Sequence, residues 1–185
     1  MKEKILCIIG GMGPEASAQL YMKMIKATKV KKDQEHFRII IDSNPKIPDR
    51  TRAILGLGES PVNDIVETAN NLQKMGVDIA CIPCITSHYF YDDVIKGTDL
   101  KIIHALEELN IYIHEEYPGI KKIGVLATTG TKNTKIFDRY LKDVTIVYPD
   151  EKFQEDYVME AIYGEGTGIK SGVTEGVPVE LLKSA

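Results

Sequence analysis

The segment Ile5-Leu-Cys-Ile-Ile-Gly-Gly-Met-Gly-Pro14 places a short apolar run directly before a glycine-rich turn and a proline. Apolar β-branched residues favour a buried strand, and proline fits the first position of a helix because its missing N–H has no helical partner there. The segment therefore predicts a strand, a tight turn and a helix that runs to about Thr28. This succession is typical of α/β proteins.

The same alternation of short apolar runs and longer helical segments continues along the chain. Further strands are expected at 37–42, 77–82, 100–103, 123–127 and 144–148. Helices are expected from about residue 51, at 61–75, from a cap at Thr86 or Ser87 to Lys96, and at 104–117, 133–141 and 153–163. The pattern of the first residues starts again at Lys122. We therefore predict an α/β fold with two pseudo-symmetric parallel-sheet halves, residues 1–118 and 119–185. No counterpart of the strand at 77–82 follows in the second half, so we expect that half to be incomplete at its C-terminus.

Composition limits the classes of function. The 185 residues are 43% hydrophobic and carry a formal net charge of -4, without the basic stripe that follows a nucleic-acid backbone. No apolar run approaches the ~20 residues that span a bilayer, and no signal peptide precedes the first strand. Three cysteines do not make a disulfide framework and suit a reducing compartment. We expect a cytoplasmic protein that binds neither nucleic acid nor membrane.

Cys84 is the best single candidate for chemistry. Cys81 and Cys84 have the spacing of a metal or redox pair, but a four-ligand zinc site needs a second pair, so no metal site is predicted. Strand alternation puts Cys81 in the core, as it does Cys7, whereas Cys84 follows Pro83 at the carboxyl edge of the sheet. A following helix N-terminus, with Thr86 or Ser87 as N-cap, would stabilise a thiolate there and make it a usable base. The alternative is an inert buried thiol.

The turn Gly11-Met-Gly-Pro-Glu-Ala16 matches a relaxed dinucleotide-binding fingerprint, and Asp42 lies where a ribose-binding acid would. Pro14 removes one N–H that a pyrophosphate would use. The turn could instead be a simple tight turn, or its N–H groups could hold a small carboxylate.

Other polar residues surround these turns in the predicted fold. His88 lies four residues after Cys84 and is expected to be half exposed, in a supporting role at best. His104 follows a strand at the carboxyl edge and could line a pocket. Arg50 and Arg52, in a loop stiffened by prolines, are candidates for a carboxylate clamp or for solvated side chains.

Four segments together resemble the aspartate/glutamate racemase family: Ile8-Ile-Gly-Gly-Met-Gly-Pro-Glu-Ala16, Asn44-Pro-Lys-Ile-Pro-Asp-Arg50, Ile82-Pro-Cys-Ile-Thr-Ser-His88 and Leu126-Ala-Thr-Thr-Gly-Thr131. The resemblance runs along nearly the whole chain. It implies two similar halves that face each other, one catalytic cysteine from each half, no cofactor and a homodimer. It also implies that Cys84 is the first catalytic cysteine and that Met12, Arg50, Thr86 and Lys170 contact the substrate.

Two positions depart from this family. The residue after the first cysteine is usually Asn, and Ile85 in its place removes an amide from the substrate-binding set. The second cysteine, in a Gly-Cys-Thr-Glu motif, is absent from these 185 residues. Gly172-Val-Thr-Glu175 resembles that motif by coincidence, because no buried strand precedes it. The chain is either a truncated version of a longer protein or a degenerate member.

The expected function is cofactor-independent racemisation of an amino acid of the aspartate/glutamate type. Cys84 would exchange the Cα proton on one face, while N–H groups near Met12 and Thr129, with Arg50 and Lys170, would hold the carboxylates. Because the second cysteine is missing, we expect weak or no racemisation by these residues alone. The alternatives are a protein that binds an amino acid or dicarboxylate without chemistry, another reaction of the same superfamily such as hydantoin racemisation or maleate isomerisation, and nucleotide binding.

Overall fold

The computed structural model describes residues 3–185, and its contacts divide the chain into two compact units, Met1–Ala105 and Leu106–Ala185. Each unit combines helices with parallel strands, so the predicted α/β class is confirmed. The predicted domain boundary after residue 118 lies beyond helix α5 (Ala105–Glu116), which the contacts assign almost entirely to the second unit. That boundary stays a prediction.

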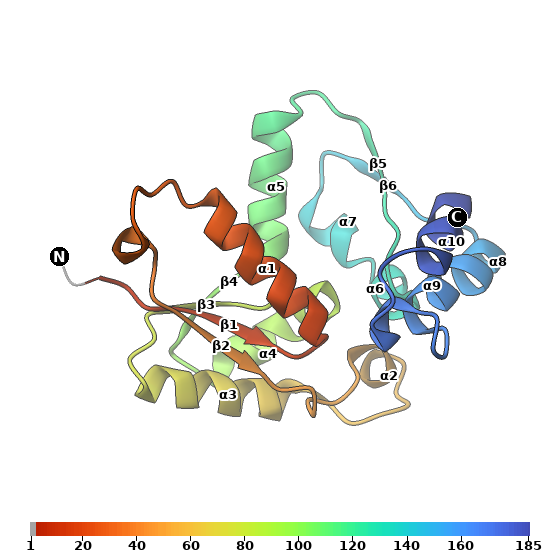
Figure 1. Cartoon of the computed structure of the whole chain (residues 1–185). Helices are drawn as coiled ribbons and strands as arrows, with labels where there is room; N and C mark the ends of the chain where they lie inside the picture. Colours follow the sequence, from red (N-terminus) through yellow and green to blue (C-terminus); the bar gives the residue numbers. More distant parts are fainter. Residues whose placement is uncertain (1–2) are drawn as a thin grey trace. The chain divides into compact units, whose positions relative to one another are not determined.

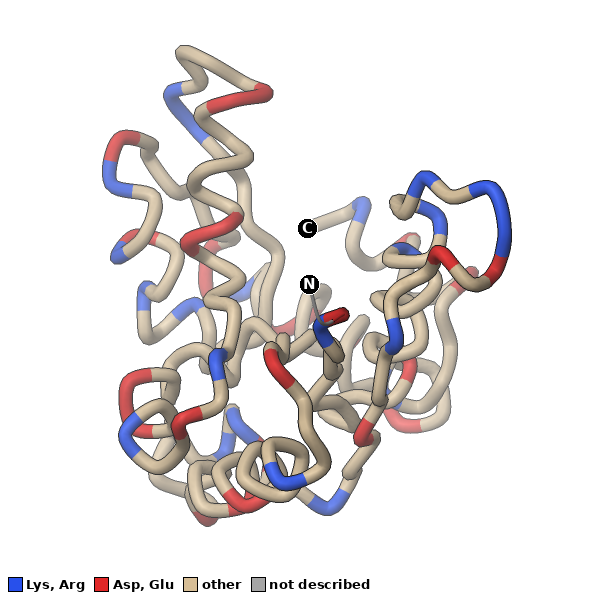
Figure 2. Tube along the Cα trace, turned by 90° about the vertical axis from the view of Figure 1, so that its left-hand side faces the viewer, with Lys and Arg blue, Asp and Glu red and all other residues tan. Residues whose placement is uncertain are grey.

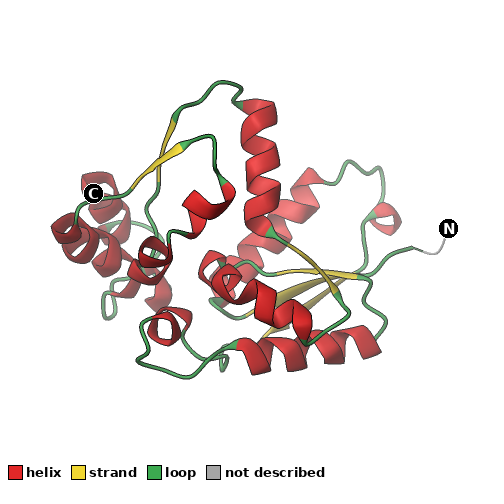
Figure 3. Ribbon diagram, turned by 180° about the vertical axis from the view of Figure 1, so that it is seen from behind, coloured by secondary structure: helices red, strands yellow, loops and turns green. Residues whose placement is uncertain are grey.

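The first unit is a four-stranded parallel sheet with helices on both faces. Its strands, in spatial order, are β2 (Ile39–Ser43), β1 (Leu6–Gly10), β3 (Ile79–Cys81) and β4 (Lys101–Ile103). Figure 1 shows α1 (Pro14–Ala27) and α3 (Val62–Lys74) on opposite faces, and Figure 3 shows the same arrangement from behind. Two short helices, α2 (Arg50–Ile54) and α4 (Tyr91–Lys96), complete this unit together with the 3₁₀ segment Asp33–Glu35 and a second one described below.

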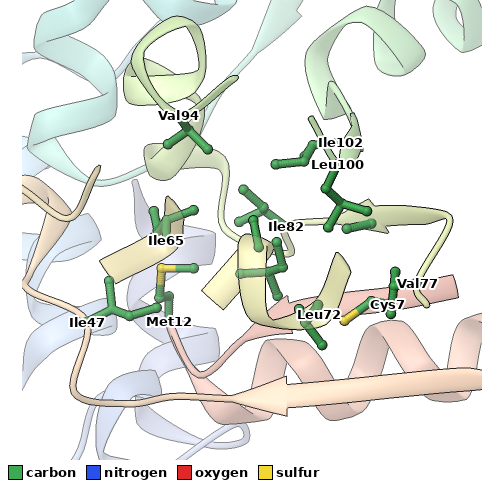
Figure 4. Close-up of a cluster of buried hydrophobic side chains, with 13 residues drawn as sticks. Cys7, Met12, Ile47, Ile65, Leu72, Val77, Ile82, Val94, Leu100 and Ile102 are labelled. Carbon is green, nitrogen blue, oxygen red and sulfur yellow. The ribbon is translucent and has the colours of Figure 1, made fainter. Parts of the chain in front are cut away.

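The core of the first unit lies between the sheet and its helices. Ile9 is fully buried and Cys7 is 1% exposed, which confirms the predicted position of Cys7 in the core. In Figure 4, Met12 and Ile47 lie at one end of this cluster and Cys7 at the other. The Cys81 thiol lies beside the core, 3.5 Å from the carbonyl oxygen of Cys7.

The end of α3 shows how the chain is returned to the sheet. Gly76 has a φ of +86°, a backbone conformation that favours glycine. Its N–H donates to Gln73 O and the Val77 N–H donates to Leu72 O, which is the bond pattern of a glycine-terminated helix. This turn sets the start of β3, whose ladder begins at Ile79, two residues later than predicted.

Other predicted boundaries also shift. β2 begins at Ile39, so the prediction of strand at Phe37 is wrong, and that side chain is 52% exposed. The predicted helix at 133–141 is divided into α6 (Thr129–Thr134) and α7 (Ile136–Tyr140), because Lys135 adopts a left-handed φ of 48° between them.

The second unit contains a smaller sheet of two parallel strands, β5 (Lys122–Gly124) and β6 (Thr145–Val147), among the residues described. Its β5–turn–α6 succession repeats the β1–turn–α1 succession of the first unit. The rest of the unit is helical: α8 (Glu151–Phe153), a π-helical stretch (Gln154–Met159), α9 (Glu160–Tyr163), a 3₁₀ turn (Ile169–Ser171) and α10 (Val177–Ser184).

Charged residues of both signs are distributed along the chain. Figure 2 shows Lys and Arg interspersed with Asp and Glu along the trace. Within residues 3–185, none of the helices has both the length and the apolar character required to cross a membrane.

Candidate functional site

The sheet of the first unit has a topological switch point between β1 and β3. The connection from β1 leads through α1 to β2 on one side, whereas the connection from β3 leads through α4 to β4 on the other. Ligands of open α/β sheets bind in the crevice at the carboxyl ends of such strands. The turns that begin at Gly10 and at Cys84 therefore occupy the place where a ligand is expected.

Close packing, rather than a ligand, requires the first glycines of the turn after β1. Gly11 has a φ of +88°, and a Cβ at this position would overlap the backbone of Asn44. Its N–H donates to Ser17 Oγ at 3.0 Å, so this N–H is not available to a phosphate or carboxylate. These contacts favour the tight-turn interpretation over the dinucleotide fingerprint.

Cys84 lies at the exit of β3, partly buried against the core. It is itself the N-cap of the 3₁₀ helix η2 (Ile85–Phe90), so the prediction that Thr86 or Ser87 caps a helix here is wrong. Ile85 and Thr86 are the first two residues of η2, and both side chains are half-buried. The backbone of Cys84 is extended, with φ -137° and ψ 102°.

Met12 joins the two turns. Its side chain is buried, and its sulfur accepts a hydrogen bond from Ser87 Oγ at 3.5 Å. Its carbonyl oxygen accepts a hydrogen bond from Arg50 Nη2 at 3.3 Å. The structure therefore brings Met12, Arg50 and the η2 segment together, and α2 contacts η2.

Arg50 and Arg52 have different roles. Arg50 is 6% exposed, and its Nη1 donates to the carbonyl oxygens of Ile47 and Pro48 at 3.1 and 2.7 Å. Its buried Nε has no hydrogen-bond partner among the described residues, so donor capacity remains for a ligand. Arg52 is exposed and donates to Leu57 O in the loop that follows α2, so both arginines belong to α2 rather than to the predicted loop.

His88 and His104 are both buried, and the sequence did not predict this burial. His88 is 3% exposed, so the expectation of a half-exposed side chain is wrong. Its Nδ1 lies 3.0 Å from Cys84 O, and its Nε2 accepts the Ala105 N–H at 3.1 Å. Burial lowers the pKa of His88 to about 4. In the sequence, the spacing of four residues between Cys84 and His88 was the signal that the two residues could lie close together.

The second unit holds the remaining predicted residues. The Thr129 N–H donates to Met159 Sδ at 3.3 Å, and its hydroxyl donates to Glu155 Oε1 at 2.7 Å. Lys170 is exposed, with Nζ 4.6 Å from the ring centroid of Tyr163.

Gln154 is a residue of the second unit that the sequence did not single out. It is 1% exposed, and its amide donates to Ala127 O at 2.8 Å and to Thr129 Oγ1 at 3.4 Å. It therefore fixes the turn after β5. The sequence carries no local signal for it, because glutamine is mostly exposed in folded proteins.

A surface cavity of about 350 Å³ lies elsewhere in the first unit. Tyr21, Met24 and Phe37 are among its lining residues, and none of the predicted site residues lines it. In the described part of the chain, no three His, Cys, Asp or Glu side chains are grouped to hold a metal ion.

Comparisons with known proteins agree with each other. Residues 9–180 match the family described as Asp/Glu/Hydantoin racemase. The broad specificity amino-acid racemase RacX of Bacillus subtilis (strain 168) is 29% identical over 139 residues, which cover 73% of this chain and 59% of RacX. The chain thus matches less than two thirds of the length of that curated relative.

Solved structures share the fold. The aspartate racemase of Picrophilus torridus has 25% identity and a TM-score of 0.78, over 97% of this chain and 77% of that one. An aspartate racemase homologue from Pyrococcus horikoshii OT3 has 20% identity and a TM-score of 0.68, over 86% of this chain and 70% of that one.

Proposed function

The chain belongs to the Asp/Glu/Hydantoin racemase family, and from this membership we propose that it takes part in cofactor-independent racemisation of an amino acid, with Cys84 as the acid/base on one face of Cα. One observation carries the assignment to Cys84. This residue follows β3 at the switch point of the sheet, and the η2 segment that it caps contacts α2, the helix that begins with Arg50. The other two cysteines do not share this position.

Burial of the Cys7 and Cys81 thiols raises the pKa of Cys7 to about 12 and that of Cys81 to about 11. Neither residue supplies a thiolate at neutral pH. Cys84 is therefore the cysteine of this chain on which the proposal rests.

The proposed reaction balances without a redox partner. The Cys84 thiolate takes the Cα proton, and the electron pair stays on the substrate as a carbanion delocalised into its carboxylate. A proton from water on the opposite face completes inversion, and the Cys84 thiol returns its proton to water, which restores the thiolate. The free N–H of Arg50 binds the carboxylate, and Met12, Ile85 and Thr86 line this side of the substrate. The substrate class is an aspartate- or glutamate-like amino acid.

A second candidate is a protein of the same fold that binds an amino acid or dicarboxylate without chemistry. Ile85 favours it, because an isoleucine side chain donates no hydrogen bond to a carboxylate. The chain has three cysteines, and the pKa values of Cys7 and Cys81 are raised, so neither of them supplies a second thiolate beside Cys84. This also favours binding without chemistry.

Isotope exchange tests both candidates. The protein is incubated in D₂O with L-aspartate, L-glutamate and neutral L-amino acids, while Cα–H exchange and chirality are followed separately. We expect Cα exchange that Cys84→Ala lowers by at least ~100-fold, as for loss of a general base. Cys81→Ala is the matched control and should retain exchange. Binding without exchange in the unmodified protein would refute the racemase proposal and support the binding protein.

A further inference from the structure

The imidazole of His88 is held at both ring nitrogens. Nε2 accepts the main-chain N–H of Ala105 at 3.1 Å, and Nδ1 lies 3.0 Å from the carbonyl oxygen of Cys84. A main-chain N–H can only donate, so Nε2 carries no proton. Nδ1 must then carry it and donate to Cys84 O. The two contacts together define one neutral tautomer of His88.

The groups around His88 keep the ring in this state. His104 packs edge-on against it at 5.0 Å between centroids, and Tyr91 lies parallel to it at 6.3 Å. Tyr91 is fixed in turn by a hydrogen bond from its hydroxyl to Ile102 O at 2.8 Å. Burial, aided by the neighbouring His104, lowers the pKa of His88. Its ring is therefore neutral and fixed in orientation at physiological pH.

We propose that His88 is a positioning residue that fixes the main chain of Cys84 and thereby the direction of its thiol. This inference rests on the proposed function of Cys84. The Cys84 backbone is extended and lies between β3 and η2, and its carbonyl oxygen accepts the Ser87 N–H at 3.1 Å as the first hydrogen bond of η2. The His88 Nδ1–H donates a second hydrogen bond to the same oxygen and so fixes it from a side chain as well. The imidazole links the exit of β3 to Ala105, the residue that follows β4 and His104.

Two variants of His88 each keep one of its two hydrogen bonds and lose the other. His88→Asn places an amide N–H near the position of Nδ1 and can keep the bond to Cys84 O. His88→Gln places its amide oxygen near the position of Nε2 and can keep the bond from Ala105 while losing the bond to Cys84. Each variant loses one hydrogen bond, so thermal unfolding should show similar losses of stability. Tyr91→Phe is the control, because it removes a hydrogen bond from the same cluster without a bond to Cys84.

Two measurements are made on each variant: Cα–H exchange of the amino acid in D₂O, and the rate at which iodoacetamide alkylates Cys84, read by peptide mass mapping. We expect His88→Gln to slow Cα exchange about tenfold and to speed alkylation at least about threefold, the effect of one lost hydrogen bond. His88→Asn and Tyr91→Phe should stay close to the unmodified protein in both measurements.

Equal effects of Asn and Gln, or effects that follow thermal stability across all three variants, would overturn the proposal and leave His88 a purely structural residue. The alkylation rates do not depend on turnover. If the unmodified protein exchanges no Cα proton, the racemase proposal fails, whereas the contrast between His88→Asn and His88→Gln in alkylation still decides the role of His88.

Discussion

Arg50 donates hydrogen bonds to three main-chain carbonyl groups, those of Met12, Ile47 and Pro48. Its guanidinium thus joins the turn after β1 to the loop before α2. A side chain with this many buried partners also contributes to folding, and its substitution leaves acceptors without donors.

The substitution Arg50→Lys tests this dual role. An ammonium group cannot reproduce the planar fork of Arg50, so we expect the free energy of unfolding to fall by about 1–3 kcal/mol. Urea denaturation measures it. Arg52→Lys is the matched control and should change stability by less than about 0.5 kcal/mol, because Arg52 is exposed. Equal losses in both variants would contradict the buried role of Arg50.

The burial of His88 makes stability depend on pH. The pKa of His88 falls from an ordinary 6.5 to about 4 in the folded protein. Between these values the unfolded chain binds a proton that the folded chain does not, so acidification favours unfolding. We expect His88 to account for a loss of at most about 3 kcal/mol as the pH falls from 6.5 to 4.

The measurement compares unfolding free energies of the unmodified protein and His88→Asn across this pH range. Carboxylates titrate in both proteins, so the difference between the two curves isolates the histidine. A difference that does not change with pH would show that His88 is protonated in the folded protein.

At the scale of elements, the turn between β1 and α1 depends on its individual glycines. We expect Gly11→Ala to lower the free energy of unfolding by at least about 2 kcal/mol, because a Cβ there overlaps the Asn44 backbone at a φ of +88°. Gly13→Ala is the matched control: no atom lies within 4 Å of its Cβ position, and its φ is -102°. It should cost less than about 1 kcal/mol. Chemical denaturation distinguishes the two.

The β1–turn–α1 segment was predictable from sequence because its signals are local. The apolar run, the glycines and Pro14 each favour the observed structure on their own. The break at Lys135 was not predictable, because lysine carries no local signal for a left-handed backbone. The burial of His88 depends on Ala105, seventeen residues away, and such a contact lies beyond any helical or strand periodicity. The sequence correctly placed Cys84 at the edge of the sheet, but it did not predict that Cys84 caps η2.

At the scale of the whole molecule, the resemblance to racemases leads us to propose a homodimer. Light scattering coupled to gel filtration should give a molar mass near twice the 20.6 kDa of one chain. Exposed apolar side chains such as Ile111 and Tyr112, at 50% and 52%, offer area for association. A constant mass of one chain at micromolar concentrations would rule the dimer out.

The two sheets differ in how many neighbouring strands each strand pairs with. β1 pairs on both sides, with β2 and β3, whereas β5 and β6 pair with each other in the described part of the chain. A strand with neighbours on both sides opens only when the whole unit opens, but a two-stranded ribbon can open locally. The amide hydrogen of Ile8 should therefore stay protected for as long as the first unit is folded, while that of Ile146 is released by much faster local fluctuations. The glycine turn and Cys84 thus follow β1 and β3, the two strands of this unit that have neighbours on both sides.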